Sequence, residues 1–143
     1  MKLLLDTSVL VAGMVEAHPE HERALVWLER VRNTDNGFIS AHSLAEVYAV
    51  LTRLPVQPKI HPEIVVNLLQ RNIFPYFTIV ELTQEDYFNA IQNLAKARLV
   101  GGIVYDALIM QTAIKAGVEQ LITLNAKDFR RLYPNSEIAI VEP

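Results

Sequence analysis

The feature that most constrains the fold is an apolar run near the amino terminus that ends in an acid. Leu3–Leu5 is followed directly by Asp6. A run without polar alternation is typical of a strand buried on both faces of a parallel sheet. Thr7 and Ser8 are residue types that cap helices, and residues 9–14 continue as an apolar helix. Asp6 is therefore expected at the carboxyl end of a central strand, where α/β sheets bind ligands. Capping of the next helix is its alternative role.

Composition limits the class of protein. The chain has 143 residues, no cysteine and a formal net charge of −3. This length is typical of a single domain, residues 1–143, with a core that needs no disulfide. Asp6 interrupts the first apolar run well short of a signal peptide, and no run approaches the ~18 residues of a membrane helix. We therefore expect a cytoplasmic protein without membrane contact and without a broad basic field for nucleic acid.

Strand-like and helix-like segments alternate along the rest of the chain. The patterns predict helices at about 19–32, 41–54, 62–71, 84–97 and 105–116. They predict short strands at 38–39, 76–82, 121–124 and 138–141, with a turn at 33–37 and a loop at 125–129. The alternation indicates a three-layer α/β domain with a mainly parallel central sheet.

Further acids fall where such a sheet would gather them. Glu46 lies two turns into the helix after the second strand and borders its apolar stripe. Asp106 is predicted as the second residue of a later helix, on an otherwise apolar face, while Asn125 and Asp128 follow the fourth strand. The carboxyl ends of parallel strands meet at one edge of a sheet. We therefore expect these groups to converge with Asp6.

Such a cluster of carboxylates calls for a cation. Acids brought close together raise one another's pKa values and destabilise the fold unless their charge is neutralised. Carboxylate, amide and hydroxyl oxygens, without cysteine, favour a hard ion, Mg²⁺ or Mn²⁺. Such an ion lowers the pKa of bound water and braces a phosphate, which favours metal-dependent phosphodiester hydrolysis. His18 and His21, three residues apart, favour a solvated helix start over a shared metal.

Four ordered motifs resemble those of a known family. They are LLLDTSVL at 3–10, SLAEVYAVLTRLP at 43–55, YDALI at 105–109 and LITLNAKDF at 121–129. Over nearly its whole length the chain resembles PIN-domain nucleases, specifically the VapC-type toxins of prokaryotic toxin–antitoxin pairs. The resemblance implies a PIN-like α/β/α fold and a homodimer. It also implies Mg²⁺- or Mn²⁺-dependent endoribonuclease activity on RNA, and a cognate antitoxin protein that covers the acidic pocket.

Carried over by motif, the resemblance assigns Asp6, Glu46 and Asp106 to the metal site and to catalysis. The family's fourth acid commonly follows the strand-end threonine by two residues, where this chain has Asn125. Its amide oxygen can still bind the metal or a metal-bound water, but one charge is lost and a second ion is weakened. Asp128, one helical turn later, either compensates as a catalytic acid or only helps to form its turn.

Hydroxyl groups beside these positions are expected to orient the carboxylates or bound waters. They are those of Thr123 and of Thr7 or Ser8, in the way that groups around a metal site hold its ligands. Thr123 is equally consistent with an ordinary hydroxyl at the end of a strand.

Two other functions remain open. A non-catalytic PIN module, with a site that has decayed at Asn125, would bind RNA or a protein partner without cleavage. A phosphatase or receiver domain fits less well, because aspartyl phosphatases need a second Asp where this chain has Ser8. An RNA ligand would need local positive charge. The candidate residues are Arg53, Lys59, Arg98, Lys127, Arg130 and Arg131.

Overall fold

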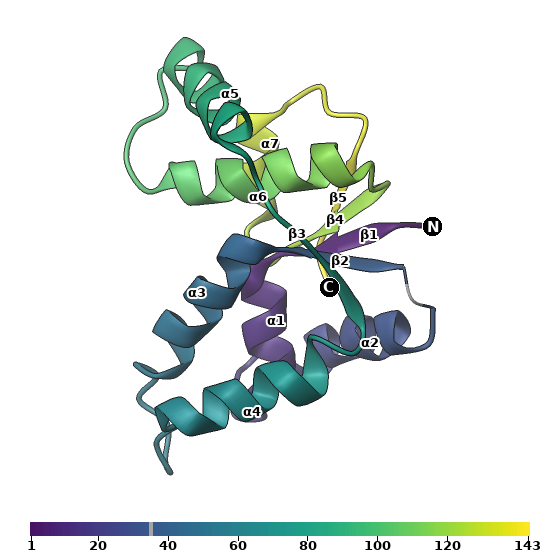
Figure 1. The fold of residues 1–143 in the computed structure, drawn as a ribbon, viewed down its shortest axis with the longest axis vertical. Coiled ribbons are helices and arrows are strands. Elements are labelled where there is room, and N and C mark those ends of the chain that lie inside the picture. Colours follow the sequence, from purple (N-terminus) through teal and green to yellow (C-terminus); the bar gives the residue numbers. More distant parts are fainter. Residues whose placement is uncertain (35) are drawn as a thin grey trace.

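A parallel sheet forms the centre of the molecule in the computed structural model, which describes residues 1–34 and 36–143 (Figure 1). Its strands are β1 (Leu3–Leu5), β2 (Gly37–Ser40), β3 (Phe77–Val80), β4 (Gln120–Ile122) and β5 (Ala139–Val141). Within these described residues the strand order is β3-β2-β1-β4-β5, and every neighbouring pair is parallel. β1 is therefore central, and the predicted parallel α/β sheet is confirmed.

Helices cover both faces of the sheet (Figure 1). One face carries α1 (Thr7–Met14), α2 (His21–Arg32), α3 (Ala41–Leu51) and α4 (Pro62–Asn72). The other face carries α5 (Gln84–Lys96), α6 (Ile103–Ala116) and α7 (Ala126–Leu132). The predicted three-layer arrangement is confirmed. Among the described residues, no helix is long and apolar enough to cross a membrane.

The core explains why the first strand has no polar residue. Leu3 and Leu5 pack into the apolar cluster beneath α1 and α2, whereas Leu4 packs on the opposite face with Met110 and Phe129. Successive side chains of a strand point to opposite faces of the sheet. Because helices cover both faces here, each of the three leucines is buried.

Several helix boundaries differ from the sequence prediction. α2 begins at His21 rather than at Pro19, because residues 16–20 form turns. α3 ends at Leu51 rather than at residue 54, and the hydroxyl of the next residue, Thr52, donates to a backbone carbonyl of the last turn. α6 begins at Ile103, so that Asp106 is its fourth residue. These differences arise at helix ends, where local patterns are weakest.

Two further predictions about elements were wrong. Residues 126–129, predicted as part of a loop, belong to the helix α7 (Ala126–Leu132), whose buried side is made by Ala126 and Phe129. A helix this short has too few buried positions to show a periodic pattern. Helical spacing with Val47 and Leu51 also predicts Tyr48 in the apolar stripe of α3, but Tyr48 is 46% exposed and the stripe includes the buried Ser43 instead. The predicted turn at 33–37 includes residue 35, which lies outside the described residues.

Candidate active site

The carboxyl end of β1 places Asp6 beside the end of β4. The register pairs Leu5 with Ile122, and the Asp6 N–H donates to the Ile122 carbonyl at 2.9 Å. Thr123, the residue after Ile122, consequently lies next to Asp6, and its hydroxyl donates to Oδ2 at 2.8 Å. Asp6 is only 3% exposed. The parallel register therefore brings together two residues that are far apart in the sequence.

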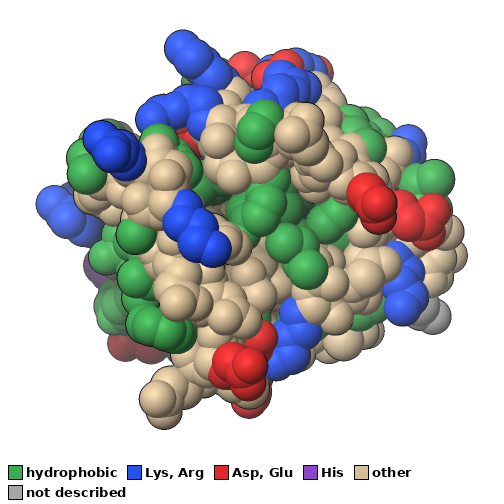
Figure 2. Space-filling model, turned by 90° about the horizontal axis from the view of Figure 1, so that it is seen from above, with side chains coloured by type: hydrophobic (Ala, Val, Ile, Leu, Met, Phe, Trp, Pro, Cys, Tyr) green, Lys and Arg blue, Asp and Glu red, His purple; other side chains and the backbone are tan. Residues whose placement is uncertain are grey.

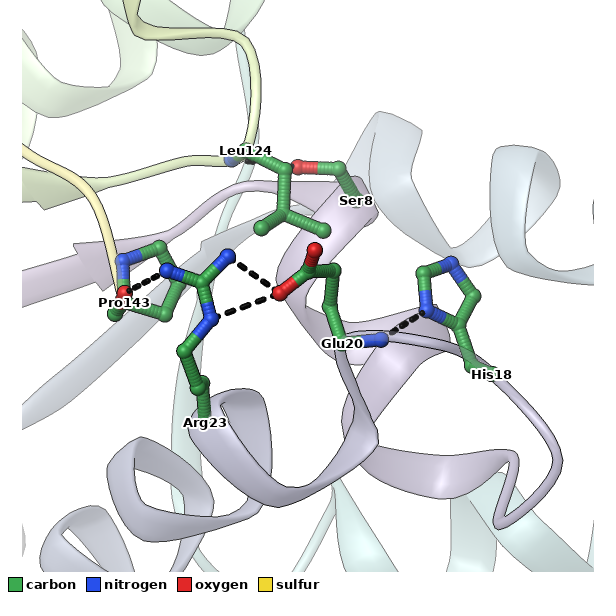
Figure 3. Close-up of polar contacts among 6 residues, drawn as sticks. All are labelled: Ser8, His18, Glu20, Arg23, Leu124 and Pro143. Carbon is green, nitrogen blue, oxygen red and sulfur yellow. Dashed lines mark hydrogen bonds and ion pairs between the residues drawn. The ribbon is translucent and has the colours of Figure 1, made fainter.

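Hydroxyl groups hold the buried carboxylate of Asp6. Ser8 Oγ donates to Oδ2 at 2.7 Å and accepts from the Leu124 N–H at 3.1 Å; Ser8 and Leu124 lie beside each other in Figure 3. Asp6 is the residue before α1, yet its side chain makes no capping hydrogen bond. Burial raises the pKa of Asp6, and the hydrogen bonds from Ser8 and Thr123 lower it. Backbone contacts with Thr7 and Ser8 lower the pKa as well, so the carboxylate is held both by the start of α1 and by the hydroxyl of Thr123 after β4.

Thr123 acts behind Asp6 rather than at the surface of the site. Its side chain is fully buried. The Asn125 N–H donates to the Thr123 hydroxyl at 2.9 Å, and this hydroxyl donates to Asp6. Because its oxygen already accepts one hydrogen bond, its proton is directed to the carboxylate. The geometry gives Thr123 a positioning role toward Asp6.

Glu46 reaches the same site from α3. The Thr7 hydroxyl lies 3.0 Å from Oε1 of Glu46 and 2.8 Å from the hydroxyl of Ser43. Burial raises the pKa of Glu46, while the hydrogen bond with Thr7 and the nearby His42 lower it, and the charge of Asp6 raises it again. Thr7 therefore connects the start of α1 to the acid of α3.

Asp106, in the first turns of α6, is a third acid whose pKa is raised at this place. Burial, followed by the negative charges of Asp6, Asp128 and Glu46 in that order, together raise the pKa of Asp106 from 3.8 to about 7. Like charges disfavour ionisation only when they lie near one another. The four acids therefore act on one another at a single place in the fold.

A cavity of about 380 Å³ gathers most of the residues predicted for the site. The predicted residues that line it are Asp6, Thr7, Ser8, Glu46, Asp106 and Asn125. Thr123 lies behind this wall. Asp128 is not part of the lining; its Oδ1 lies 3.6 Å from Nη1 of Arg131, and its side chain is 46% exposed. Asp128 reaches the site through its charge rather than through contact.

Histidines near the acids were not predicted as part of the site. His18 lines the cavity from the turn between α1 and α2, and its Nδ1 accepts from the Glu20 N–H at 3.0 Å (Figure 3). Arg23 steadies this turn by contacting the carboxylate of Glu20 and the Pro143 carbonyl, as Figure 3 shows. No local pattern signals this position of His18, because the turn reaches the cavity only through tertiary packing.

His42 lies one helical turn before Glu46 on α3. Its Nε2 is 3.9 Å from Oε1 of Glu46. This spacing of four residues places both side chains on one face of the helix and is visible in the sequence. The helical spacing was therefore a usable signal that His42 borders the site.

The residues around the cavity fit a hard divalent cation. Within the described residues, no three Asp, Glu or His side chains stand close enough to form a ready-made metal cluster. The cavity nevertheless offers mainly carboxylate, hydroxyl and amide oxygens, the donors that Mg²⁺ and Mn²⁺ prefer. Mutual repulsion of the acids raises the pKa of Asp106, and a cation would relieve this repulsion.

The chain is similar to several proteins of known name or structure. Ribonuclease VapC40 of Mycobacterium tuberculosis is 36% identical over 116 residues, which cover 81% of each chain. The structure of VapC20 of Mycobacterium tuberculosis, described as a toxin that cleaves the sarcin–ricin loop, aligns with a TM-score of 0.69 at 16% identity, over 84% of this chain and 87% of that one. The structure of VapBC2 of Rickettsia felis, bound to a promoter DNA fragment, aligns with a TM-score of 0.68 at 21% identity. The alignment covers 99% of this chain and 98% of that one.

A family model described as PIN domain matches residues 3–134. The match spans every strand and helix that contributes an acid to the cavity. The chain therefore belongs to the PIN domain family.

Proposed function

We propose that this chain is a metal-dependent endoribonuclease. The observation that carries the proposal is the convergence of Asp6, Glu46 and Asp106, from β1, α3 and α6, on one cavity. The name of the relative VapC40, a ribonuclease, supports RNA as the substrate. A Mg²⁺ or Mn²⁺ ion held by these acids would supply an activated water and brace the scissile phosphate.

The chain's own residues prepare the site for this reaction. Ser8 and Thr123 hold Asp6 in one orientation, and Thr7 does the same for Glu46. Carboxylates that are already fixed need little reorganisation to hold a cation, and the cation would offset the negative charge that builds up on the phosphate during hydrolysis. Hydrolysis would join the water oxygen to phosphorus as that water gives up a proton, and would break the bond to the leaving ribose oxygen, which takes up a proton in turn.

Asn125, rather than Asp128, is proposed to complete the metal shell. Asn125 lines the cavity, whereas Asp128 faces Arg131. An amide oxygen is a suitable ligand for a hard cation. In this proposal Asp128 does not touch the metal or the substrate. It acts on the site through its negative charge, which raises the pKa of Asp106.

We propose further that the chain, as a single domain, is the toxin of a toxin–antitoxin pair. It would act in the cytoplasm as a homodimer, and a cognate antitoxin protein would cover the acidic cavity. Support comes from the likeness of the fold to VapC20, described as a toxin, and to VapBC2. Co-purification of the chain with the product of an adjacent gene, with loss of RNA cleavage in the complex, would test this assignment.

The nuclease proposal is tested first by titrating Mn²⁺ into the purified chain in a calorimeter. The wild-type chain should bind Mn²⁺ and cleave RNA in a reaction that EDTA stops. Asp6→Asn should lose Mn²⁺ binding and reduce cleavage at least ~100-fold, because a charged ligand is removed while the shape is kept. Glu63→Gln is the matched control, since Glu63 is an exposed acid on α4 outside the cavity.

The outcomes separate the possible functions. Binding and cleavage that persist in Asp6→Asn would overturn the site assignment. A wild-type chain that neither binds Mn²⁺ nor cleaves RNA would overturn the nuclease proposal and leave the non-catalytic PIN module, decayed at Asn125, as the alternative.

A further inference from the structure

Two aromatic rings stack beside the acidic cavity. The rings of His42 and Tyr105 are parallel within 1°, with centroids 5.5 Å apart. His42 precedes Glu46 by one turn on α3, and Tyr105 directly precedes Asp106 on α6. The stack therefore joins the two helices that each carry an acid of the cavity.

Tyr105 keeps much of its surface open although one face of its ring is covered. Its exposed fraction is 51%. A tyrosine at a surface usually has freedom to rotate, but stacking on His42 holds this ring in one plane. The uncovered part of a fixed aromatic ring is a site on which a planar group can lie.

His42 is placed by packing rather than by a hydrogen bond of its own ring nitrogen. Its Nε2 is buried and has no hydrogen-bond partner among the described residues. The carboxylate of Glu46 is 3.9 Å from this nitrogen, beyond hydrogen-bond distance. A buried polar atom without a partner costs free energy. His42 therefore lies between its stacking contact with Tyr105 and the acid of α3 that lines the cavity.

We propose that Tyr105, backed by His42, is the platform on which one unpaired base of the RNA substrate stacks next to the scissile phosphate. The inference rests on the proposed ribonuclease function and names its substrate class. Stacking does not depend on charge, so it can hold RNA beside acids that repel its phosphates. A base inside a duplex is already stacked on both faces. The substrate is therefore single-stranded or looped RNA.

Binding of a fluorescent single-stranded RNA, followed by anisotropy in EDTA, tests the platform without metal or cleavage. Tyr105→Ala should weaken binding about 5- to 150-fold, which corresponds to 1–3 kcal/mol for one stacked base. Tyr105→Phe keeps the ring and should bind within about twofold of wild type. Tyr87→Ala is the control, since Tyr87 lies on α5 and is 40% exposed. A blunt RNA duplex should not distinguish Tyr105→Ala from wild type.

Cleavage kinetics with abasic RNA give the second measurement. An abasic nucleotide is placed at one position at a time on either side of the cleavage site. At the position whose base stacks on Tyr105, the abasic nucleotide should raise the KM of the wild type about as much as Tyr105→Ala raises it with intact RNA, and kcat should change little. In Tyr105→Ala that position should have no further effect, because ring and base form one interaction. A purely structural role would instead give additive losses at every position.

Each outcome decides one of the two proposals. Unchanged single-strand binding and KM in a folded Tyr105→Ala, or equal losses with single-stranded and duplex RNA, would overturn the platform while leaving the nuclease intact. A wild-type chain that cleaves no RNA overturns the nuclease proposal, and loss of single-strand binding in Tyr105→Ala alone would still support the platform.

Discussion

At the scale of single residues, the carboxyl group of Asp106 contributes a pH dependence to the stability of the metal-free protein. Its pKa is raised from 3.8 to about 7, chiefly by burial. The folded state therefore binds this proton more tightly than the unfolded state does. The contribution of protonated Asp106 to the free energy of unfolding is fully present below pH 3.8. It is lost as the pH rises through about 7. The sign is opposite to that of an acid in a surface ion pair.

Asp106→Asn should consequently be more thermostable than the wild type at pH 8 in EDTA, because the neutral amide removes the buried charge. The difference in Tm should shrink steadily toward ~pH 4.5, where Asp106 is protonated. Thermal unfolding of both proteins across this range measures it. The comparison between variant and wild type cancels the titration of shared groups that lie away from the cavity, whereas the acids that interact with Asp106 titrate together with it.

Saturating Mn²⁺ supplies the control for this prediction. At pH 8 the ion should raise the Tm of the wild type, since a ligand bound only to the folded state stabilises it, and should raise that of Asp106→Asn much less. A difference in Tm that does not vary with pH would show that Asp106 is not the titrating group.

At the scale of elements, the crossing of α1 and α2 holds the residues that orient the acids. α1 carries Thr7 and Ser8 at its start and Gly13 near its end. A Cβ added at Gly13 would lie 2.1 Å from Cδ1 and 3.0 Å from Cγ of Leu28. Leu28 is only 2% exposed, so its side chain has little room to move aside. Glycine is therefore required at this position by close packing.

Gly13→Ala should destabilise the protein by about 1 kcal/mol. Alanine favours a helix by ~1 kcal/mol over glycine, but overpacking a core costs ~1–3 kcal/mol, and the second effect is expected to win. Urea unfolding measures the change. In the double variant Gly13→Ala/Leu28→Ala the overlap is gone. The stability lost by the double variant should therefore be smaller than the sum of the losses of the two single variants. A stabilised Gly13→Ala would contradict the packing explanation.

At the scale of the whole molecule, positive charge is dispersed. The net charge is −3, and on the face shown in Figure 2 the Lys and Arg side chains lie around an apolar patch instead of forming one field. Among the basic residues considered for RNA, Lys127, Arg130 and Arg131 share α7, the helix that begins directly after Asn125. Arg131 contacts Asp128, and Arg130 donates to the Ile140 carbonyl at 3.4 Å.

Lys127→Gln should therefore weaken single-stranded RNA binding modestly at low salt. If Lys127 meets one phosphate, the slope of log K against log salt concentration should become shallower by ~0.7. Anisotropy titrations between about 50 and 200 mM salt measure this slope. Lys2→Gln is the control and should leave the slope unchanged, because Lys2 precedes β1 at the edge of the sheet opposite to the acids. Equal slopes for wild type and Lys127→Gln would exclude this contact.

The amino-acid sequence by itself determined the parallel α/β fold and the position of Asp6. The unbroken leucines of β1 require burial on both faces, and helices on both sides of a parallel sheet supply it. The capping box of α5, with Thr83 and Asp86, and the left-handed Gly117 that ends α6 were also readable, because each depends on neighbouring residues only. The convergence of Glu46 and Asp106 on the cavity with Asp6 followed from the topology of such a sheet.

Only the tertiary structure decided which side chains complete the cavity. The helix α7, the arrival of His18 at the acids and the exclusion of Asp128 from the lining depend on packing between distant segments. The stack of His42 on Tyr105 likewise joins residues from α3 and α6. Local sequence patterns report the contacts of a residue with its own element. Contacts between elements are set by how the layers pack, and a single sequence carries no periodic signal of them.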